Sequence, residues 1–212
     1  MKLTHFGHAC VLVEIDGTRI LMDPGAFSTG FEDLTGLDAV LVTHQHFDHL
    51  KPDVIPALVH NNPGVVLACD PQTAEQQGGD WQALQVGDSL TVGAVTVAVQ
   101  GGVHAEIHAD IPRIDNVALL LGTATAPGQL LHPGDSFHVP QEKVDVLALP
   151  SGAPWMKTGE AVDYLRAVSP RVAVPIHEAV LAMPQMAYDM FTNLGPKGTT
   201  VTVLERGVAT EV

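Results

Sequence analysis

Three imidazoles and one carboxylate stand within six positions of one segment of the chain. The segment holds His44, His46, Asp48 and His49, and it follows an apolar run at 37–42 that is typical of a buried strand. Neutral imidazole and carboxylate groups bind zinc, iron and manganese, and side chains two apart on extended backbone point to the same side. Chance would give this spacing in roughly one such chain in 1,000. The segment therefore predicts a metal site.

Side chains that could bind or support a metal recur where other expected strands end. Strands in layered α/β folds give way to loops along one edge of a sheet, where a rigid scaffold can hold polar groups in register. We expect the following residues to gather at such an edge: Asp23, His44, His104, Asp135 and His177.

Short β-rich runs separated by turns make up most of the chain. The runs at 9–15 and 18–22 flank Asp16-Gly17, a strong hairpin signal. Helices are expected at 52–59 and at 158–168, the second with Thr158 as its N-cap. No linker divides these elements, so we predict a single domain over residues 1–212. The other expected strands cover 37–43, 65–69, 89–92, 94–99, 117–121, 129–132, 144–149 and 171–176.

Composition narrows the classes of protein that the chain could be. Its net charge of -14 opposes binding to nucleic acid, and this disfavours a nuclease. No apolar run approaches the roughly 18 to 20 residues that cross a bilayer, and no export signal stands at the N-terminus, so we expect a cytoplasmic protein with no membrane partner. Cys10 and Cys69 lie in apolar runs, which favours buried free thiols over a disulfide.

The segment His44 to His49 resembles the H-x-H-x-D-H signature of the metallo-β-lactamase superfamily. The start of the chain at 7–13 and the stretch at 174–177 resemble the compact branch that includes the ascorbate-6-phosphate lactonase-like and N-acyl-phosphatidylethanolamine phospholipase D-like proteins. The resemblance implies an α/β fold, a four-layer αβ/βα sandwich with a dinuclear metal site at one edge.

The resemblance also implies which residues bind two divalent ions. His44, His46 and His104 would hold the first ion, and Asp135 would bridge to the second. His108 is the alternative to His104 as the third histidine ligand of the first ion. His104 is favoured because it follows its strand more directly. The remaining ligands of the second ion would be Asp48, His49 and His177. Zinc is the expected metal, with manganese or iron as alternatives.

Two such ions would bridge a water molecule and turn it into a hydroxide nucleophile at neutral pH. Asp48 and Asp135 are the expected catalytic carboxylates, and Asp48 could orient the hydroxide or shuttle its proton. Asp23 and His8 are candidates for supporting the metal ligands, although Asp23 could equally be a turn residue and His8 a structural one. His108 and Lys157 are candidates for substrate contact, and Lys157 could equally be a solvated lysine at a helix start.

The function predicted on this basis is a metal-dependent hydrolase that acts on a small ester, lactone, amide or phosphoester. The alternatives are an iron-dependent oxidoreductase of the same fold and a non-catalytic metal-binding protein. The expected partner is a small-molecule substrate, and a homo-oligomer stays open.

Overall fold

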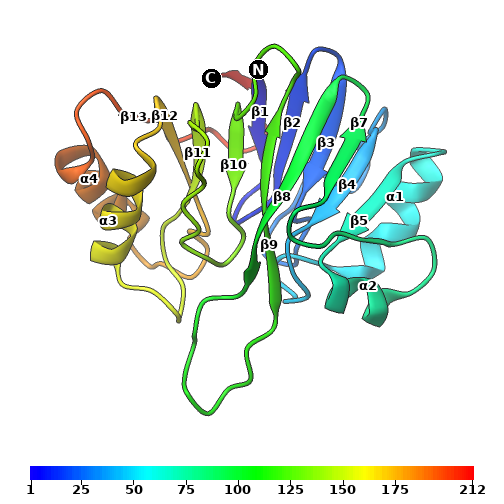
Figure 1. The fold of residues 1–212 in the computed structure, drawn as a ribbon, viewed down its shortest axis with the longest axis horizontal. Helices are drawn as coiled ribbons and strands as arrows, with labels where there is room; N and C mark the ends of the chain where they lie inside the picture. Colours follow the sequence, from blue (N-terminus) through cyan, green and yellow to red (C-terminus); the bar gives the residue numbers. More distant parts are fainter.

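Two seven-stranded sheets pack face to face, with helices on their outer faces (Figure 1). The structure is a computed structural model that describes all 212 residues. This arrangement confirms the expected αβ/βα sandwich. The first sheet has the order β14 (Thr210–Glu211), β1 (Lys2–His5), β2 (Val11–Ile15), β3 (Thr18–Met22), β4 (Ala39–Val42), β5 (Val66–Cys69) and β6 (Gln82–Ala83).

The second sheet is formed by the later part of the chain. It has the order β13 (Thr200–Val201), β12 (Val172–Ile176), β11 (Val146–Pro150), β10 (Leu130–His132), β9 (Asp115–Gly122), β8 (Val95–Val103) and β7 (Ser89–Val92). Within each sheet one run of strands is parallel: β3 with β4, β5 and β6, and β10 with β11, β12 and β13. Parallel strands end at a common edge, so residues that follow them are brought together.

The helices cover the outer faces of the two sheets. A short 3-10 turn (Pro52–Val54), α1 (Ile55–Asn61) and α2 (Pro71–Gln77) lie beside the first sheet, and α3 (Thr158–Val168) and α4 (Pro184–Leu194) beside the second (Figure 1). Leu58 of α1 packs with Leu21 and Val40, and Phe191 of α4 packs with Leu147. The central strands of each sheet are therefore buried on both faces.

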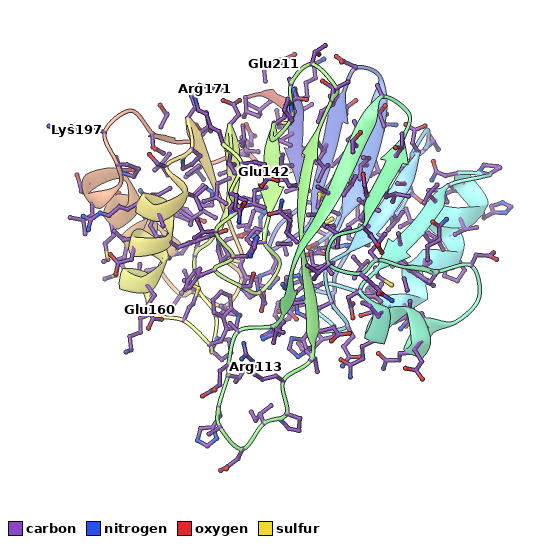
Figure 2. The ribbon with its side chains drawn as sticks, viewed as in Figure 1. Arg113, Glu142, Glu160, Arg171, Lys197 and Glu211 are labelled. Atoms are coloured by element: carbon purple, nitrogen blue, oxygen red, sulfur yellow. The ribbon has the colours of Figure 1, made fainter.

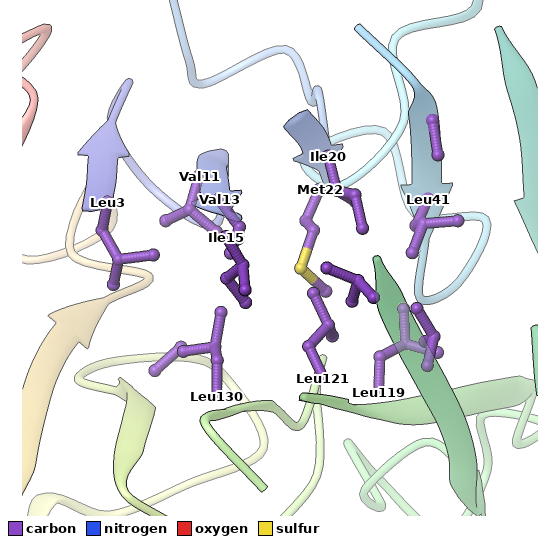
Figure 3. Close-up of a cluster of buried hydrophobic side chains, with 14 of the residues drawn as sticks. Leu3, Val11, Val13, Ile15, Ile20, Met22, Leu41, Leu119, Leu121 and Leu130 are labelled. Atoms are coloured by element: carbon purple, nitrogen blue, oxygen red, sulfur yellow. The ribbon is translucent and has the colours of Figure 1, made fainter. Parts of the chain in front are cut away.

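Strands buried on both faces explain the continuous apolar runs of the sequence. Because successive side chains alternate, Ile20 and Met22 of β3 point between the sheets, whereas Leu21 points toward the helices. Figure 3 shows the layer between the sheets, in which Leu119, Leu121 and Leu130 of the second sheet face side chains of the first.

The expected strands and both expected helices are present, most of them with shifted ends, whereas the strand at 89–92 and the helix at 158–168 have the predicted bounds. Strand β8 continues to Val103, further than the hydrophobic run, because its last residues pair with β9. The N-cap assigned to Thr158 is wrong: Thr158 is the first residue of α3, Lys157 is the cap, and the Lys157 amide donates to Glu160 Oε2. The sequence analysis missed α2, which begins at Pro71 behind the Asp70 cap, and it missed α4 and the short strand β1.

A long loop at 104–114 joins β8 to β9 and extends beyond the edge at which β3, β4, β8, β10 and β12 end (Figure 1). Figure 2 shows Arg113 on this loop. The guanidinium of Arg113 donates from Nε and Nη2 to the carbonyl oxygen of His104, at 3.0 and 2.7 Å, and so ties the two ends of the loop together. The chain has no helix that combines the length and the apolar character needed to cross a membrane.

Candidate metal centre

The segment after β4 is fixed by a buried carboxylate on the neighbouring strand. Asp23, directly after β3, accepts hydrogen bonds from the amide and the hydroxyl of Thr43 at 2.7 and 2.8 Å. The Thr43 carbonyl in turn accepts from the amide of Val117 in the second sheet. A Cβ at Gly25 would collide with the backbone of Asp48, so glycine is required where the two loops touch. Thr43 therefore ties the histidine-rich segment to both sheets.

Eight side chains at this edge form two groups, each with ligand atoms within 4.8 Å of one another. The first group is His44, His46, His104 and Asp135, and the second group is His8, Asp48, His49 and His177. All seven residues that the sequence analysis proposed as ligands fall into these two groups. His8, expected only as a supporting residue, lies in the second group as well.

Asp135 faces both groups. Its Oδ1 lies 3.0 Å from His49 Nε2 and 3.1 Å from His177 Nε2, and its Oδ2 lies 3.3 Å from His104 Nε2. The indole N–H of Trp155 donates to the same Oδ2 at 2.7 Å. The residue that the sequence analysis predicted as the bridging ligand therefore lies between histidines of the two groups.

Unpaired polar atoms in the two groups fit divalent ions. His104 Nε2, Asp135 Oδ1 and His8 Nδ1 are buried and make no hydrogen bond, although buried polar groups are nearly always paired. Imidazole nitrogens also face one another, with His44 Nε2 3.1 Å from His46 Nδ1 and His49 Nε2 3.2 Å from His177 Nε2. Nitrogen and carboxylate donors of this kind are the ligands of zinc, manganese and iron.

Burial keeps several of these imidazoles neutral. It lowers the pKa of His44 well below its ordinary value, and it also lowers the pKa values of His8 and His46. Neutral imidazole is the form that binds a metal. His49 differs: burial alone would lower its pKa, but the carboxylates of Asp135 and Asp23 outweigh burial and hold it well above the usual range.

The two carboxylates that face the histidines are ionised. Burial opposes ionisation of Asp48, but the hydrogen bond from His8 and the nearby charges of His49 and His177 lower its pKa to about 2. Burial likewise opposes ionisation of Asp135, and His49 and His177 hold the pKa of Asp135 well below its usual range.

Outer partners orient the rings of the histidines. Asp23 Oδ2 lies 2.7 Å from His49 Nδ1, the Ala105 carbonyl 2.6 Å from His104 Nδ1, and the Gly152 carbonyl 2.7 Å from His177 Nδ1. Such partners fix the ring orientation of a metal-binding histidine and raise its basicity. The structure places Asp23 where the sequence analysis expected a supporting carboxylate.

Three residues of the site adopt a backbone conformation that side chains other than glycine rarely take. His8, Asp23 and His177 have φ values of 52°, 49° and 62°. Such residues cost of the order of 1 to 3 kcal/mol each and cluster at functional sites. The amide of His177 donates to the carbonyl of His8 at 2.8 Å, so two of the strained residues hold one another.

Several residues outside the two groups support His8 and the loop that carries it. Glu178 Oε1 accepts from the amide of His8 and from Arg206 Nη2, at 3.1 and 2.7 Å, across large sequence separations. His5, which the sequence analysis left without a role, lies 2.9 Å from the His8 carbonyl through its Nε2. His132 Nε2 donates to the Ala9 carbonyl at 3.0 Å and so supports the same loop. Only the folded chain brings these groups together.

Two predicted substrate contacts lie away from the groups. His108 is exposed on the 104–114 loop, where its Nδ1 accepts from the amide of Asp110, and it belongs to neither group. The Lys157 side chain is 87% exposed and lies 4.0 Å from Glu160. The residue that does reach the site from this region is Trp155.

A cavity of about 340 Å³ opens beside both groups. His46, Asp48, His104, Asp135 and His177 form its polar side. The other side is apolar and includes Phe27, Phe47, Ile107 and Trp155. A small molecule in this cavity would contact both groups of metal-binding side chains.

Fold and site define the class: this is a metallo-β-lactamase fold with a candidate dinuclear centre. A family model described as beta-lactamase superfamily domain matches residues 2–177. The structure is similar to that of Igni18, a metallo hydrolase from Ignicoccus hospitalis, with a TM-score of 0.78, 22% identity and coverage of 99% of this chain and 97% of the other.

Sequence relatives identify the family within this superfamily. Protein Rv0786c of Mycobacterium tuberculosis is 55% identical over 182 residues, which cover 86% of each protein. UPF0173 protein PF0020 of Pyrococcus furiosus is 31% identical over 189 residues, covering 84% of this chain and 83% of the relative. The chain belongs to the UPF0173 family of the metallo-β-lactamase superfamily. A Methanoregula boonei relative, 28% identical over 84% of this chain and 82% of its own length, is named a UPF0173 metal-dependent hydrolase.

Proposed function

We propose that this protein is a dizinc hydrolase that acts on a small ester, lactone or amide. The proposal rests on the placement of Asp135. Its Oδ1 faces His49 of the second group and its Oδ2 faces His104 of the first group, and Oδ1 is buried without a hydrogen bond. The first group would hold one ion and the second group the other. The motifs at 7–13 and 174–177 support a place near the lactonase-like and phospholipase D-like branch.

Zinc ions held by these groups would supply Lewis-acid activation of a water molecule and of the substrate carbonyl. Asp48 lines the cavity, and its Oδ2 lies 3.0 Å from His8 Nε2. Because its pKa is lowered to about 2, Asp48 is ionised at neutral pH and can orient the attacking water by accepting a hydrogen bond. Asp135 keeps the two groups in register, and Trp155 fixes its orientation.

The decisive experiment is metal analysis of the wild type and of Asp135→Asn, both purified without chelator. We expect about two zinc ions per wild-type chain and fewer than one in the variant, because the variant removes the charge that both groups share. Turnover of an activated ester should fall by more than about a hundredfold, the upper end of the loss caused by removing an outer partner alone. Asp163→Asn, at an exposed position of α3, is the matched control and should keep both ions.

Two results would overturn the proposal. Full turnover by Asp135→Asn would show that the site does not perform the reaction. A wild-type protein that contains iron and consumes oxygen with a thiol substrate would favour the oxidoreductase alternative.

A further inference from the structure

The cavity beside the metal-binding groups has an apolar wall built from several loops. Phe27 follows β3, Phe47 lies inside the histidine-rich segment, and Ile107 belongs to the 104–114 loop. Pro154, Trp155 and Val180 complete this wall from the second sheet's side. Loops from both halves of the chain therefore contribute apolar side chains to the same small space.

Two phenylalanines in this wall are exposed to solvent. Of the six in the chain, Phe6, Phe31 and Phe191 are buried and Phe137 is half-buried, whereas Phe27 and Phe47 are 40% and 61% exposed. Both exposed rings line the cavity, where they pack edge to face with centroids 5.2 Å apart. Burying apolar surface stabilises a complex in proportion to the area that is removed from water. An apolar ligand group against these rings would gain this stabilisation.

No lysine or arginine lines the cavity. Arg113 donates to the His104 carbonyl, Arg206 to Glu178, and Lys157 points into solvent beside Glu160. The carboxylates of Asp48 and Asp135 are the acidic groups in the lining. A phosphate or carboxylate on the part of a substrate that meets the apolar wall would be desolvated without a partner, which is costly.

We infer that the substrate is a neutral carbonyl compound whose apolar acyl chain or aryl group lies against the wall formed by Phe27, Phe47, Ile107 and Trp155. The inference rests on the proposed hydrolase function and narrows its substrate class. In the reaction, the oxygen of water forms a bond to the carbonyl carbon and the bond to the alcohol or amine breaks. The departing oxygen or nitrogen takes up one proton, and the acid product releases the other as it becomes a carboxylate.

The first test compares zinc-loaded turnover of three p-nitrophenyl esters, namely the acetate, the hexanoate and the half-ester of adipic acid. The hexanoate and adipate acyl chains have the same length, but the adipate chain ends in a carboxylate. We expect kcat/KM for the hexanoate to exceed that for the acetate by at least about tenfold. We expect the adipate half-ester to fall at least about tenfold below the hexanoate, because its charge meets no cation.

Variants test whether the apolar wall causes the preference for the hexanoate over the acetate. Phe47→Ala should reduce the ratio of hexanoate to acetate kcat/KM by about fivefold or more, because it removes a ring that the longer chain covers. Met186→Ala is the matched control: it shortens an exposed apolar side chain on α4, outside the cavity, and should keep the wild-type ratio.

A binding measurement separates the inference from the hydrolase proposal. The chain has two tryptophans, so in a Trp81→Phe background the fluorescence of Trp155 reports on the cavity. N-phenylhexanamide, a neutral and slowly hydrolysed probe, should quench this fluorescence at a concentration at least about tenfold lower than the corresponding adipic monoanilide.

Failure of the hydrolase function and failure of the inferred apolar specificity would give different results. Zinc-loaded protein that binds N-phenylhexanamide but turns over no ester would contradict the hydrolase function and leave the apolar specificity standing. Turnover that favours the adipate half-ester, or a chain-length ratio that survives Phe47→Ala, would overturn the inference and leave the hydrolase function intact.

Discussion

The two groups of metal-binding side chains differ in what holds their histidines. In the first group uncharged oxygens face the outer nitrogens of two rings: the Thr43 hydroxyl lies 3.1 Å from His44 Nδ1 and the Ala105 carbonyl 2.6 Å from His104 Nδ1. In the second group the Gly152 carbonyl faces His177 in the same way, but a buried carboxylate faces His49, since Asp23 Oδ2 lies 2.7 Å from His49 Nδ1. The second group therefore has more negative charge around it.

The two groups also differ in backbone strain. His8 and His177 of the second group have left-handed backbone, whereas no residue of the first group does. The strained pair is held by the network of His5, Glu178 and Arg206. The first group is thus built from residues close to the ends of β4, β8 and β10, whereas the second also needs Asp23 and distant side chains to keep its geometry.

Among the changes that affect one group more than the other, Asp23→Asn should have the largest effect. The change preserves the size of the side chain but removes the negative charge beside His49. Breaking a buried ion pair destabilises the folded protein by about 3 to 5 kcal/mol. The affinity of one of the two zinc ions should fall by about 10- to 100-fold, because an outer partner of a metal-binding histidine is lost. Zinc titration against a competing chelator would resolve the two binding steps.

Because Asp23 faces His49 of the second group, we expect Asp23→Asn to have little effect on the ion held by the first group. Equal weakening of both steps in Asp23→Asn would show that the two groups act as one unit. Asp163→Asn serves again as the control for an aspartate change outside the site.

Asp70 provides a contrast to Asp23 at the same edge of the first sheet. It is buried after β5 and caps α2 by accepting from the Thr73 amide, but its Oδ2 has no partner and no imidazole group includes it. Burial raises the pKa of Asp70 to about 6 from an ordinary value of 3.8. This carboxylate, unlike Asp23, has no cation that offsets the cost of burial.

Asp70→Asn should therefore gain stability relative to the wild type as the pH rises. Between pH 4 and 6 the unfolded chain gives up this proton before the folded chain does, so the wild type loses stability with rising pH, and above pH 6 the loss is constant. The full difference is about 3 kcal/mol at most, since each pKa unit corresponds to about 1.4 kcal/mol. Denaturant unfolding of both proteins at pH 4.5 and 7 measures the difference in their free energies of unfolding. A difference that does not change with pH would contradict the raised pKa of Asp70.

The smallest expected effect is that of Trp155→Phe. The variant keeps an apolar ring in the cavity wall but removes the N–H that donates to Asp135 Oδ2, the oxygen that faces His104 of the first group. We expect the ion of the first group to bind about tenfold more weakly, the lower end of the effect of losing an outer partner. Chelator competition should show the weaker step in this variant and not in Phe137→Leu, whose ring packs on Trp155 and has no N–H to donate to the carboxylate.

Much of the fold could be predicted from the sequence because the strands are apolar over their whole length and end at clear turns. The hairpin about Asp16-Gly17 and the helix at 158–168 are present as expected. Helix α2 was missed because Ala74 is its single apolar residue, so its sequence has no apolar periodicity. Helix α4 was missed although its buried residues Ala187, Tyr188 and Phe191 have helical spacing, because the proline after Met183 was not interpreted as a helix start.

The sequence by itself predicted the kinds of ligand and the chain positions that would provide them, because residues that follow strands must come to an edge of a sheet. It could not decide between His104 and His108, or show that His8 joins the second group, because those outcomes depend on the path of a loop and on left-handed backbone. Only the tertiary structure decided that Trp155 and not Lys157 reaches Asp135, and that Glu178 and Arg206 hold His8. These contacts join residues far apart in the chain, and their energy comes from packing and charge that no local pattern of residues contains.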